Sequence, residues 1–195
     1  MKDQLESIGA RVRVAAPLNR MVYWRVGGPA DFFVEVDEVE CLQKVMALAP
    51  VTVIGNGSNA LVHDEGIRGI VLRLRGELAR LKIDGTQAVA GAGMMLTVLL
   101  SRLDRAGLCG AEPFAGVPGT VGGAVVMNAG TRLGEAKDLV RSVELVLPGG
   151  ELRHWSAEEL SFRYRHAEIP DGAVVARAHL SLSNESVDDK RVERQ

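Results

Sequence analysis

The stretch VTVIGNGSNALV, residues 51–62, carries the first chemical signal of the sequence. Four strand-forming residues run into Gly55, Asn56, Gly57, Ser58 and Asn59, which we call the first glycine loop. A glycine-rich turn after a strand offers unobstructed backbone N–H groups, and such concave nests bind phosphate oxygens. A tight surface turn that uses Asn and Gly only for positive φ is the alternative. The loop alone does not decide between them.

The first glycine loop differs from the two best-known phosphate motifs. It lacks the Lys-Ser/Thr ending of loops that hold nucleoside triphosphates, and it does not have the spacing GxGxxG. A Rossmann-type NAD fold is therefore disfavoured.

A second stretch, GAEPFAGVPGTVGGAVVMNAG at residues 110–130, is built almost wholly from small residues. Small residues let the backbone approach a ligand closely, and Pro118 reduces the entropy lost when a ligand fixes the chain. Residues 121–126 carry no charge. This composition suits a ligand with a flat apolar ring and a dianionic linker, as in a flavin dinucleotide. A small-residue helix buried in the core is the alternative, although its glycines would weaken it.

Composition limits the class of protein. The chain has 195 residues, 47% of them hydrophobic, and a net charge of −2 with both signs interspersed, so we expect a small-molecule partner and neither nucleic acid nor a membrane. Cys41 and Cys109 stand far apart without metal-site spacing, which predicts buried, reduced thiols and no metal. The N-terminus shows no signal-peptide pattern. We expect a cytoplasmic monomer.

Hydrophobic periodicity predicts alternating strands and helices in the first half of the chain. Strands at 32–36 and 51–54 flank a helix near 37–48, which gives a β-α-β start. A strand at 70–74 precedes a hairpin at 80–90, whose turn is the Asp84-Gly85 pair. A helix over 96–106 ends at Gly107, and loop follows it.

The second half of the sequence predicts further strands. Residues 140–147 and 151–155 form a hairpin around the turn at 148–150, SAEEL opens a short helix capped by Ser156, and 173–182 form a final strand. A composition shift near 76–85 divides two sub-domains. We therefore predict an α+β fold with an N-terminal segment (1–16), a first sub-domain (17–76), a second (77–183) and a loose charged tail or linker (184–195).

Five ordered motifs together resemble one family. RVGGPADFFVEV at 25–36, VIGNGSNALVHDEGIRGIVLRL at 53–74, GAG at 91–93, GLCGAEPFAGVPGTVGGAVVMNAG at 107–130 and ELSFRYR at 159–165 are similar to the UDP-N-acetylenolpyruvoylglucosamine reductase (MurB) family. The resemblance implies an FAD-binding domain of the vanillyl-alcohol-oxidase/PCMH type, with non-covalent FAD between two α+β sub-domains. It further implies that NADPH reduces the flavin, which then reduces UDP-N-acetylglucosamine enolpyruvate to UDP-N-acetylmuramate for peptidoglycan synthesis.

The resemblance also places the cofactor contacts. The expected FAD-binding residues are Gly55, Asn56, Gly57, Ser58, Asn59, Gly91, Gly93, Ala115, Gly116, Val117, Pro118, Gly119, Thr120, Gly122, Gly123, Ala124, Asn128 and Gly130. Most of these residues belong to the two glycine-rich stretches that composition alone marked as candidate ligand-binding loops.

The resemblance assigns the family's catalytic arginine to Arg165, with Tyr164 beside it as a substrate-binding residue. Hydride addition beside a carboxylate builds negative charge, and a fixed guanidinium lowers that barrier. An exposed, salt-bridging arginine is the alternative reading.

The sequence also departs from the family. Ala167 and Val22 stand where serine and threonine are usual, and the family's proton-donating serine and later glutamate are not among these residues. We therefore expect a fragment without the C-terminal substrate domain, and impaired activity for the isolated chain, since acid catalysis contributes about 10²–10⁴ in rate. A stand-alone FAD module or sensor, or an oxidase of the same superfamily, stays open.

Overall fold

The computed structural model describes residues 1–185, and its framework is two β-sheets. The first sheet has four strands. β1 is antiparallel to β2, whereas β4 is parallel to both β2 and β3. In spatial order the strands are β1 (Arg11–Pro17), β2 (Pro29–Val36), β4 (Ile67–Leu74) and β3 (Val51–Val53).

The second sheet has five strands, and each neighbouring pair is antiparallel. In spatial order they are β10 (Leu152–Ser156), β9 (Val140–Val146), β11 (Val174–Ser181), β6 (Gln87–Gly91) and β5 (Leu81–Asp84). A small two-stranded sheet pairs β7 (Gly130–Thr131) with β8 (Gly134–Glu135).

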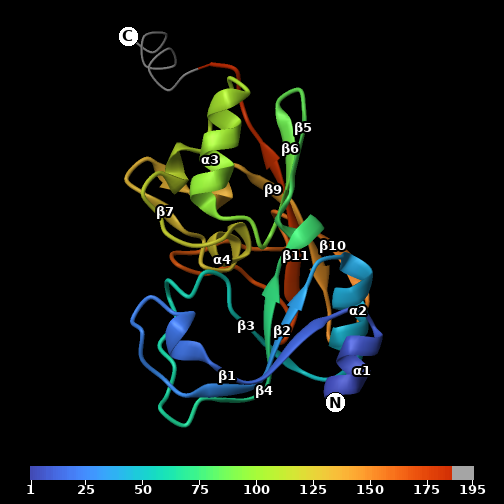
Figure 1. Ribbon diagram of the computed structural model, residues 1–195. Helices are drawn as coiled ribbons and strands as arrows, with labels where there is room; N and C mark the ends of the chain where they lie inside the picture. The colour runs from blue at the N-terminus through green and yellow to red at the C-terminus, as the bar shows by residue number, and fades with distance from the viewer. Residues whose placement is uncertain (186–195) are drawn as a thin grey trace.

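The helices are short and lie around the sheets (Figure 1). α3 and the β5–β6 hairpin lie in the upper part of that view, β1 lies in the lower part, and α4 lies between them. The helical segments are α1 (Lys2–Ser7), α2 (Val39–Leu48), α3 (Leu96–Arg105), α4 (Val121–Val126) and the 3-10 turns η1 (Leu18–Arg20), η2 (Gly76–Ala79), η3 (Glu112–Phe114) and η4 (Ala136–Asp138).

One large hydrophobic core joins the two sheets. It takes Leu42 and Val45 from α2, Leu99 and Leu103 from α3, and the inward-facing residues of both sheets. A smaller core around Phe33 lies on the other side of the first sheet. Burial of apolar surface on both sides of β2 and β4 fixes the first sheet, so the loops at its edge have a rigid base.

The structure confirms the predicted α+β class and most of the predicted elements. α2 occupies the predicted helix between β2 and β3, although β4 lies between those two strands. The Asp84-Gly85 pair forms the β5–β6 turn, with Gly85 at φ +55°. Gly107, at φ +70°, follows the end of α3 as predicted.

Three expectations were wrong. SAEEL forms turns without a helix, although Ser156 and Glu159 exchange the hydrogen bonds of a capping box. Residues 11–16, predicted within a separate N-terminal segment, belong to β1 and complete the first sheet. The region 110–130 is not all loop, since α4 forms there with Val121, Ala124 and Val125 buried.

The predicted sub-domain boundary at 76–77 stays a prediction, although the first sheet ends at Leu74 and the second begins at Leu81. Most of the predicted tail, 186–195, lies outside the described residues. Among residues 1–185, no helix has both the length and the apolar character needed to cross a membrane.

Both cysteines are free thiols, as expected. Cys41 is buried, and this burial raises the pKa of its thiol, so the reactive thiolate is disfavoured. Cys109 is half-buried, whereas the sequence predicted a buried thiol, and its backbone forms a bridge with Ser183.

We predict that Leu99→Ala lowers the free energy of unfolding by about 2–5 kcal/mol, because Leu99 is fully buried between α3 and the sheet. Val98→Ala is the matched control, since Val98 is 41% exposed on the same helix, and it should change stability by less than about 0.5 kcal/mol. Urea denaturation followed by circular dichroism measures both. Equal losses would contradict this assignment of the core.

Candidate functional site

A cleft of about 650 Å³ lies between the two sheets and is the candidate site. Both halves of the fold contribute to it: the first glycine loop and the ends of β3 and β4 on one side, and α4, the start of α3 and the start of β11 on the other. Sites at the junction of two structural units are where small-molecule clefts commonly occur.

The first glycine loop begins where the β3–β4 ladder ends. Ile54 N–H still bonds to the carbonyl of Leu72 (2.9 Å), and the chain then turns away from the sheet. Gly57 has φ +68°, and a Cβ atom there would collide with the carbonyl oxygen of Met21. Tyr23 N–H bonds to the Gly57 carbonyl (3.0 Å). The turn is therefore held tightly against residues 21–23, which only glycine allows.

The second glycine loop, residues 115–124, runs from η3 into α4. Its backbone is tied to the segment before α3: Leu96 N–H bonds to the Gly119 carbonyl (3.0 Å), and Val121 N–H bonds to the Met94 carbonyl (2.9 Å). Gly122 N–H bonds to the Ala92 carbonyl (2.9 Å). These bonds fix the loop before any ligand binds.

The two glycine loops meet at one place. Ser58 Oγ donates a hydrogen bond to the Pro118 carbonyl (3.2 Å). A Cβ atom on Gly55 would lie 2.6 Å from Thr120 Oγ1, and one on Gly119 would lie 3.1 Å from Ser58 Oγ. The loops therefore pack so closely that a side chain at Gly55 or Gly119 would crowd Thr120 or Ser58.

Several backbone N–H groups at this meeting point have no protein acceptor. Within residues 1–185, no hydrogen bond is donated by the N–H groups of residues 55–59, Gly119, Thr120 or Gly123. Peptide N–H groups on two facing loops form a concave set of donors, which suits an anion with many oxygens. A diphosphate fits this chemistry, so these residues fit a dinucleotide cofactor.

Apolar side chains continue the cleft away from the loops. Val53, Met95 and Val126 line it and are 46%, 39% and 44% exposed, respectively. Large apolar groups exposed together inside a concavity mark a ligand site. These walls suit flat, apolar rings.

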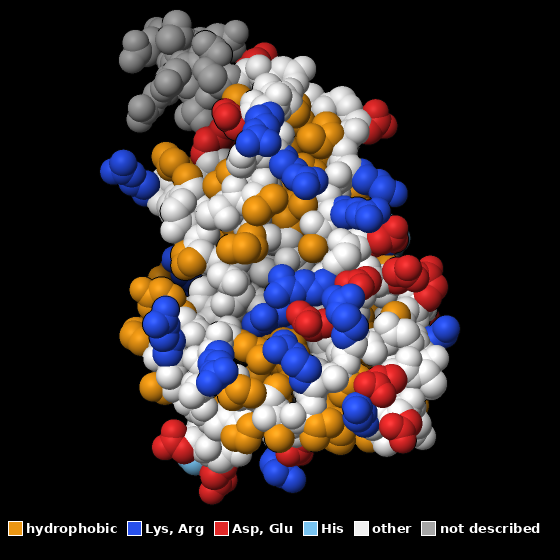
Figure 2. Space-filling view, viewed as in Figure 1, with side chains coloured by type: hydrophobic (Ala, Val, Ile, Leu, Met, Phe, Trp, Pro, Cys, Tyr) orange, Lys and Arg blue, Asp and Glu red, His pale blue; other side chains and the backbone are white. Residues whose placement is uncertain are grey.

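Two arginines from the β4 end bring positive charge to the cleft wall. The Arg73 guanidinium lies 5.1 Å from the centre of the Phe33 ring, and its Nε is buried without a partner. Burial lowers the pKa of Arg73 from its usual value, but arginine stays charged. Arg75 is paired with Glu35 (3.1 Å). In Figure 2, Lys and Arg side chains gather at mid-height of the molecule.

Arg165 lies at the tip of a tight turn at the far side of the cleft. Arg163 and His166 exchange backbone hydrogen bonds of 2.9 and 3.1 Å, and Arg165 adopts φ +55°. Its Nη1 lies 3.5 Å from the Gly130 carbonyl oxygen, and its guanidinium carbon lies 5.4 Å from the Tyr164 ring centre. Residues 163–166 therefore form a turn and are not extended, and the Arg163 guanidinium pairs with Glu168 (3.0 Å).

Asn128 holds this turn in place. It is fully buried at φ +40°, and its amide donates to Glu135 Oε2 and to the Arg163 carbonyl, both at 2.9 Å. Its side-chain oxygen accepts a bond from Lys137 N–H (3.0 Å). Hydrogen bonds from Lys137 and Asn128 lower the pKa of Glu135. Both polar atoms of the Asn128 side chain are therefore hydrogen-bonded, and the bond to the Arg163 carbonyl ties Asn128 to the turn that carries Arg165.

Most of the residues predicted from the sequence line the cleft. They are Gly55, Asn56, Gly57, Ser58, Asn59, Gly93, Val117, Pro118, Gly119, Thr120, Gly122, Gly123, Ala124 and Arg165.

Six predicted residues do not line the cleft. Ala115 and Gly116 precede the part of the loop that reaches it, and Tyr164 is 81% exposed beside it. Asn128 and Gly130 pack behind the wall, and Gly91 packs against the backbone of Leu78.

Sequence reasoning missed the side walls of the cleft. The missed lining residues are Val51, Val53, Ile54, Ala60, Arg73, Leu74, Arg75, Ala92, Met95, Leu96, Val126, Met127, Ala129, Gly172, Ala173, Val174 and Val175. Most are ordinary strand or helix residues, and nothing in their local pattern marks them. The sequence contains one signal for these walls, which is the pair of arginines at positions 73 and 75 at the end of an apolar strand.

Comparison with known proteins identifies the type of cleft. The family described as "FAD binding domain" matches residues 30–156. A UDP-N-acetylenolpyruvoylglucosamine reductase of Anaeromyxobacter sp. is 45% identical over an alignment of 175 positions that covers 86% of this chain and 54% of the relative. A second such reductase, of Symbiobacterium thermophilum, is 39% identical over 93% of this chain and 62% of its own length.

Solved structures agree with these relatives. The crystal structure of UDP-N-acetylenolpyruvylglucosamine reductase from Thermus caldophilus superposes with a TM-score of 0.83 at 40% identity, over 95% of this chain and 66% of that one. Physcomitrella patens BBE-like 1, at 20% identity and a TM-score of 0.65, shares the fold. The chain spans between about half and two thirds of the length of these reductases. The resemblance predicted from the motifs is therefore confirmed, and the chain belongs to the FAD binding domain family, in which its relatives are UDP-N-acetylenolpyruvoylglucosamine reductases.

Proposed function

We propose that this chain is the FAD-binding part of an NADPH-dependent reductase that converts UDP-N-acetylglucosamine enolpyruvate to UDP-N-acetylmuramate, a precursor of peptidoglycan. The observation that carries the proposal is the meeting of the two glycine loops, whose unpaired N–H groups face one cleft that also receives Arg165. The relatives at 39% and 45% identity are reductases of this name, which supports the reaction.

Different parts of the cleft would hold different parts of FAD. The N–H groups of residues 55–59, with Gly119, Thr120 and Gly123, hold the diphosphate. The apolar walls hold the rings without a covalent bond. FAD, when bound, supplies the hydride chemistry, while the protein supplies orientation and charge.

Arg165 is proposed to act on the substrate carboxylate. Adding hydride to an enol ether next to a carboxylate places negative charge on that carboxylate in the transition state, and a guanidinium fixed beforehand stabilises it. The turn at 163–166 and its anchor Asn128 hold the arginine at the cleft. The Tyr164 ring lies beside its guanidinium, with 5.4 Å between the ring centre and the guanidinium carbon.

We prefer a reductase to an oxidase because the relatives at 39% and 45% identity are reductases. A chitooligosaccharide oxidase shares the fold at 14% identity, which supports the architecture and not the reaction. A nucleotide-sugar substrate is a charged metabolite, which supports a cytoplasmic enzyme with a small-molecule partner, and we propose that it acts as a monomer.

We predict that the purified chain carries one FAD per molecule and shows the flavin absorption bands, because its donor set is preformed. The measurement is a visible spectrum before and after denaturation, with added FAD for any chain purified empty. A colourless protein that takes up no added FAD would refute the cofactor assignment.

We predict that Gly55→Ala weakens FAD binding by about tenfold or more, because the new Cβ atom pushes Thr120 and separates the loops. The double variant Gly55→Ala/Thr120→Ala should recover most of that loss, since the atom that the Cβ meets first is gone. Fluorescence titration of FAD measures both, with Thr120→Ala alone as the control. Additive losses in the double variant would show that the loop contact is not the cause.

We predict that Arg165→Ala slows the reoxidation of reduced, FAD-loaded chain by UDP-N-acetylglucosamine enolpyruvate by about 10²–10³. FAD affinity should stay within a few-fold, since Arg165 is at the edge of the cleft and away from the glycine loops. Anaerobic stopped-flow absorbance follows the reaction, and Arg163→Ala is the matched control from the same turn. An equal loss in both variants would point to damage of the turn and against a catalytic Arg165.

A further inference from the structure

We propose that the outer face of the second sheet carries a site for a divalent transition-metal ion, formed by Glu144, His154 and His179. One ligand atom from each of these residues lies within 4.8 Å of the others. None of the three lines the cleft between the sheets, so the site is separate from the proposed FAD site.

The register of three neighbouring strands brings these side chains together. His154 of β10 is directly opposite Glu144 of β9. On the other side of β9, Arg177 of β11 is opposite Glu144, and His179 follows it by two residues. Directly paired residues share a face of an antiparallel sheet, and so do residues two apart along a strand. The three candidate ligands therefore lie on one face by construction of the sheet.

The carboxylate is already oriented for such a role. Glu144 is 9% exposed, its Oε2 accepts a bond from Arg177 Nη1 (2.7 Å), and its Oε1 lies 3.1 Å from His179 Nε2. A carboxylate ligand fixed by a second hydrogen bond is the usual arrangement around protein metal ions. The charge of Arg177 opposes a cation, so we expect weaker binding than at a closed structural zinc site.

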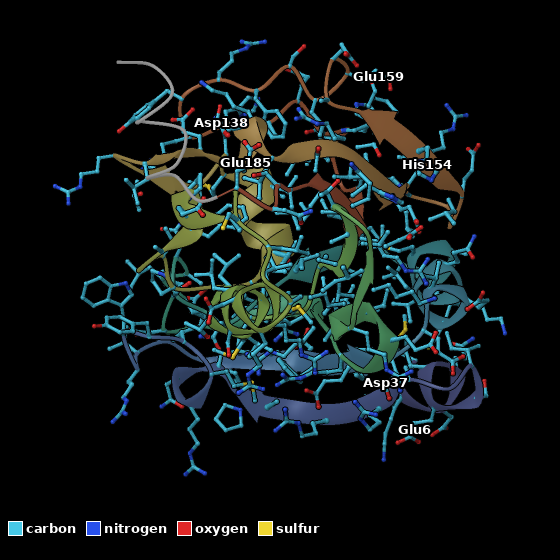
Figure 3. All side chains as sticks on the ribbon, turned by 90° about the horizontal axis from the view of Figure 1, so that it is seen from above. Glu6, Asp37, Asp138, His154, Glu159 and Glu185 are labelled. Carbon is cyan, nitrogen blue, oxygen red and sulfur yellow. The ribbon has the colours of Figure 1, made fainter. Side chains whose placement is uncertain are left out.

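The two imidazoles complete the ligand set and leave it accessible. The His154 and His179 rings are 5.1 Å apart between centroids and tilted by 49°. Within residues 1–185, no hydrogen bond engages the exposed His154 ring, which lies at the edge of the molecule on β10 (Figure 3). Its ring can thus rotate toward Glu144 and close the set around an incoming ion.

The chemistry of the donors selects the ion. Two imidazole nitrogens and one carboxylate suit Zn²⁺ and its neighbours, with bonds of about 2.0–2.2 Å and water in the fourth position. Mg²⁺ and Ca²⁺ prefer sets made of oxygen atoms alone. The competing explanation is a hydrogen-bonded cluster of Arg177, Glu144 and His179 that serves the sheet without any ion.

Zinc titration of the untagged, chelator-treated full chain tests the proposal. Isothermal calorimetry should show one saturable site, and Zn²⁺ should raise the melting temperature because the ion ties β9, β10 and β11 together. His154→Ala should weaken binding by about tenfold or more. His63→Gln, which changes an exposed histidine elsewhere, should leave the affinity unchanged.

Co²⁺ supplies an independent readout, since a histidine-bound ion gives visible absorption bands that depend on its geometry. Those bands should be lost in His179→Ala and in Glu144→Gln, with folding checked by circular dichroism. Absence of saturable zinc binding up to millimolar concentration would overturn the proposal. Equal weakening by His63→Gln and His154→Ala would do the same. FAD content is measured in parallel and should not change, so failure here is distinguishable from failure of the FAD assignment.

Discussion

The close approach of two backbone loops is the constraint on which the site depends. Gly55 lies against the Thr120 side chain, and Ser58 Oγ bonds to the Pro118 carbonyl, so the contact leaves no space for a Cβ atom at Gly55. This contact places residues of both loops, whose N–H groups donate no hydrogen bond within residues 1–185, on the lining of one cleft. Binding to a preformed donor set avoids the entropy of ordering the loops when the ligand arrives.

The sheets keep this contact in place. The first loop leaves the β3–β4 edge, whereas the second is bonded to residues 92–96, which lead from β6 into α3. A single large core of α2, α3 and both sheets fixes these two supports relative to each other. Because protein cores are close-packed, a small shift in that core would be transmitted to the loop contact.

The turn that carries Arg165 depends on a different device. Its tip is exposed and has few apolar contacts, so packing cannot fix it. Instead Asn128, buried and in a left-handed conformation, connects the turn backbone to Glu135 and Lys137. Buried polar networks that are fully satisfied are rigid and specific, and this network holds Asn128 in its left-handed conformation.

The sequence by itself determined the class of fold, most helices and strands, and both glycine loops, because periodicity and glycine content are local properties. Its motifs also led to the family. It gave the six-residue helix α4 only as an alternative to a loop, since burial in the core overrides the weak helix propensity of Gly122 and Gly123. Only the tertiary structure decided that Val53, Arg73 and Val175 share a cleft, and that Glu144, His154 and His179 meet across three strands. Such contacts depend on strand order and register, which long-range packing fixes and which no short stretch of sequence encodes.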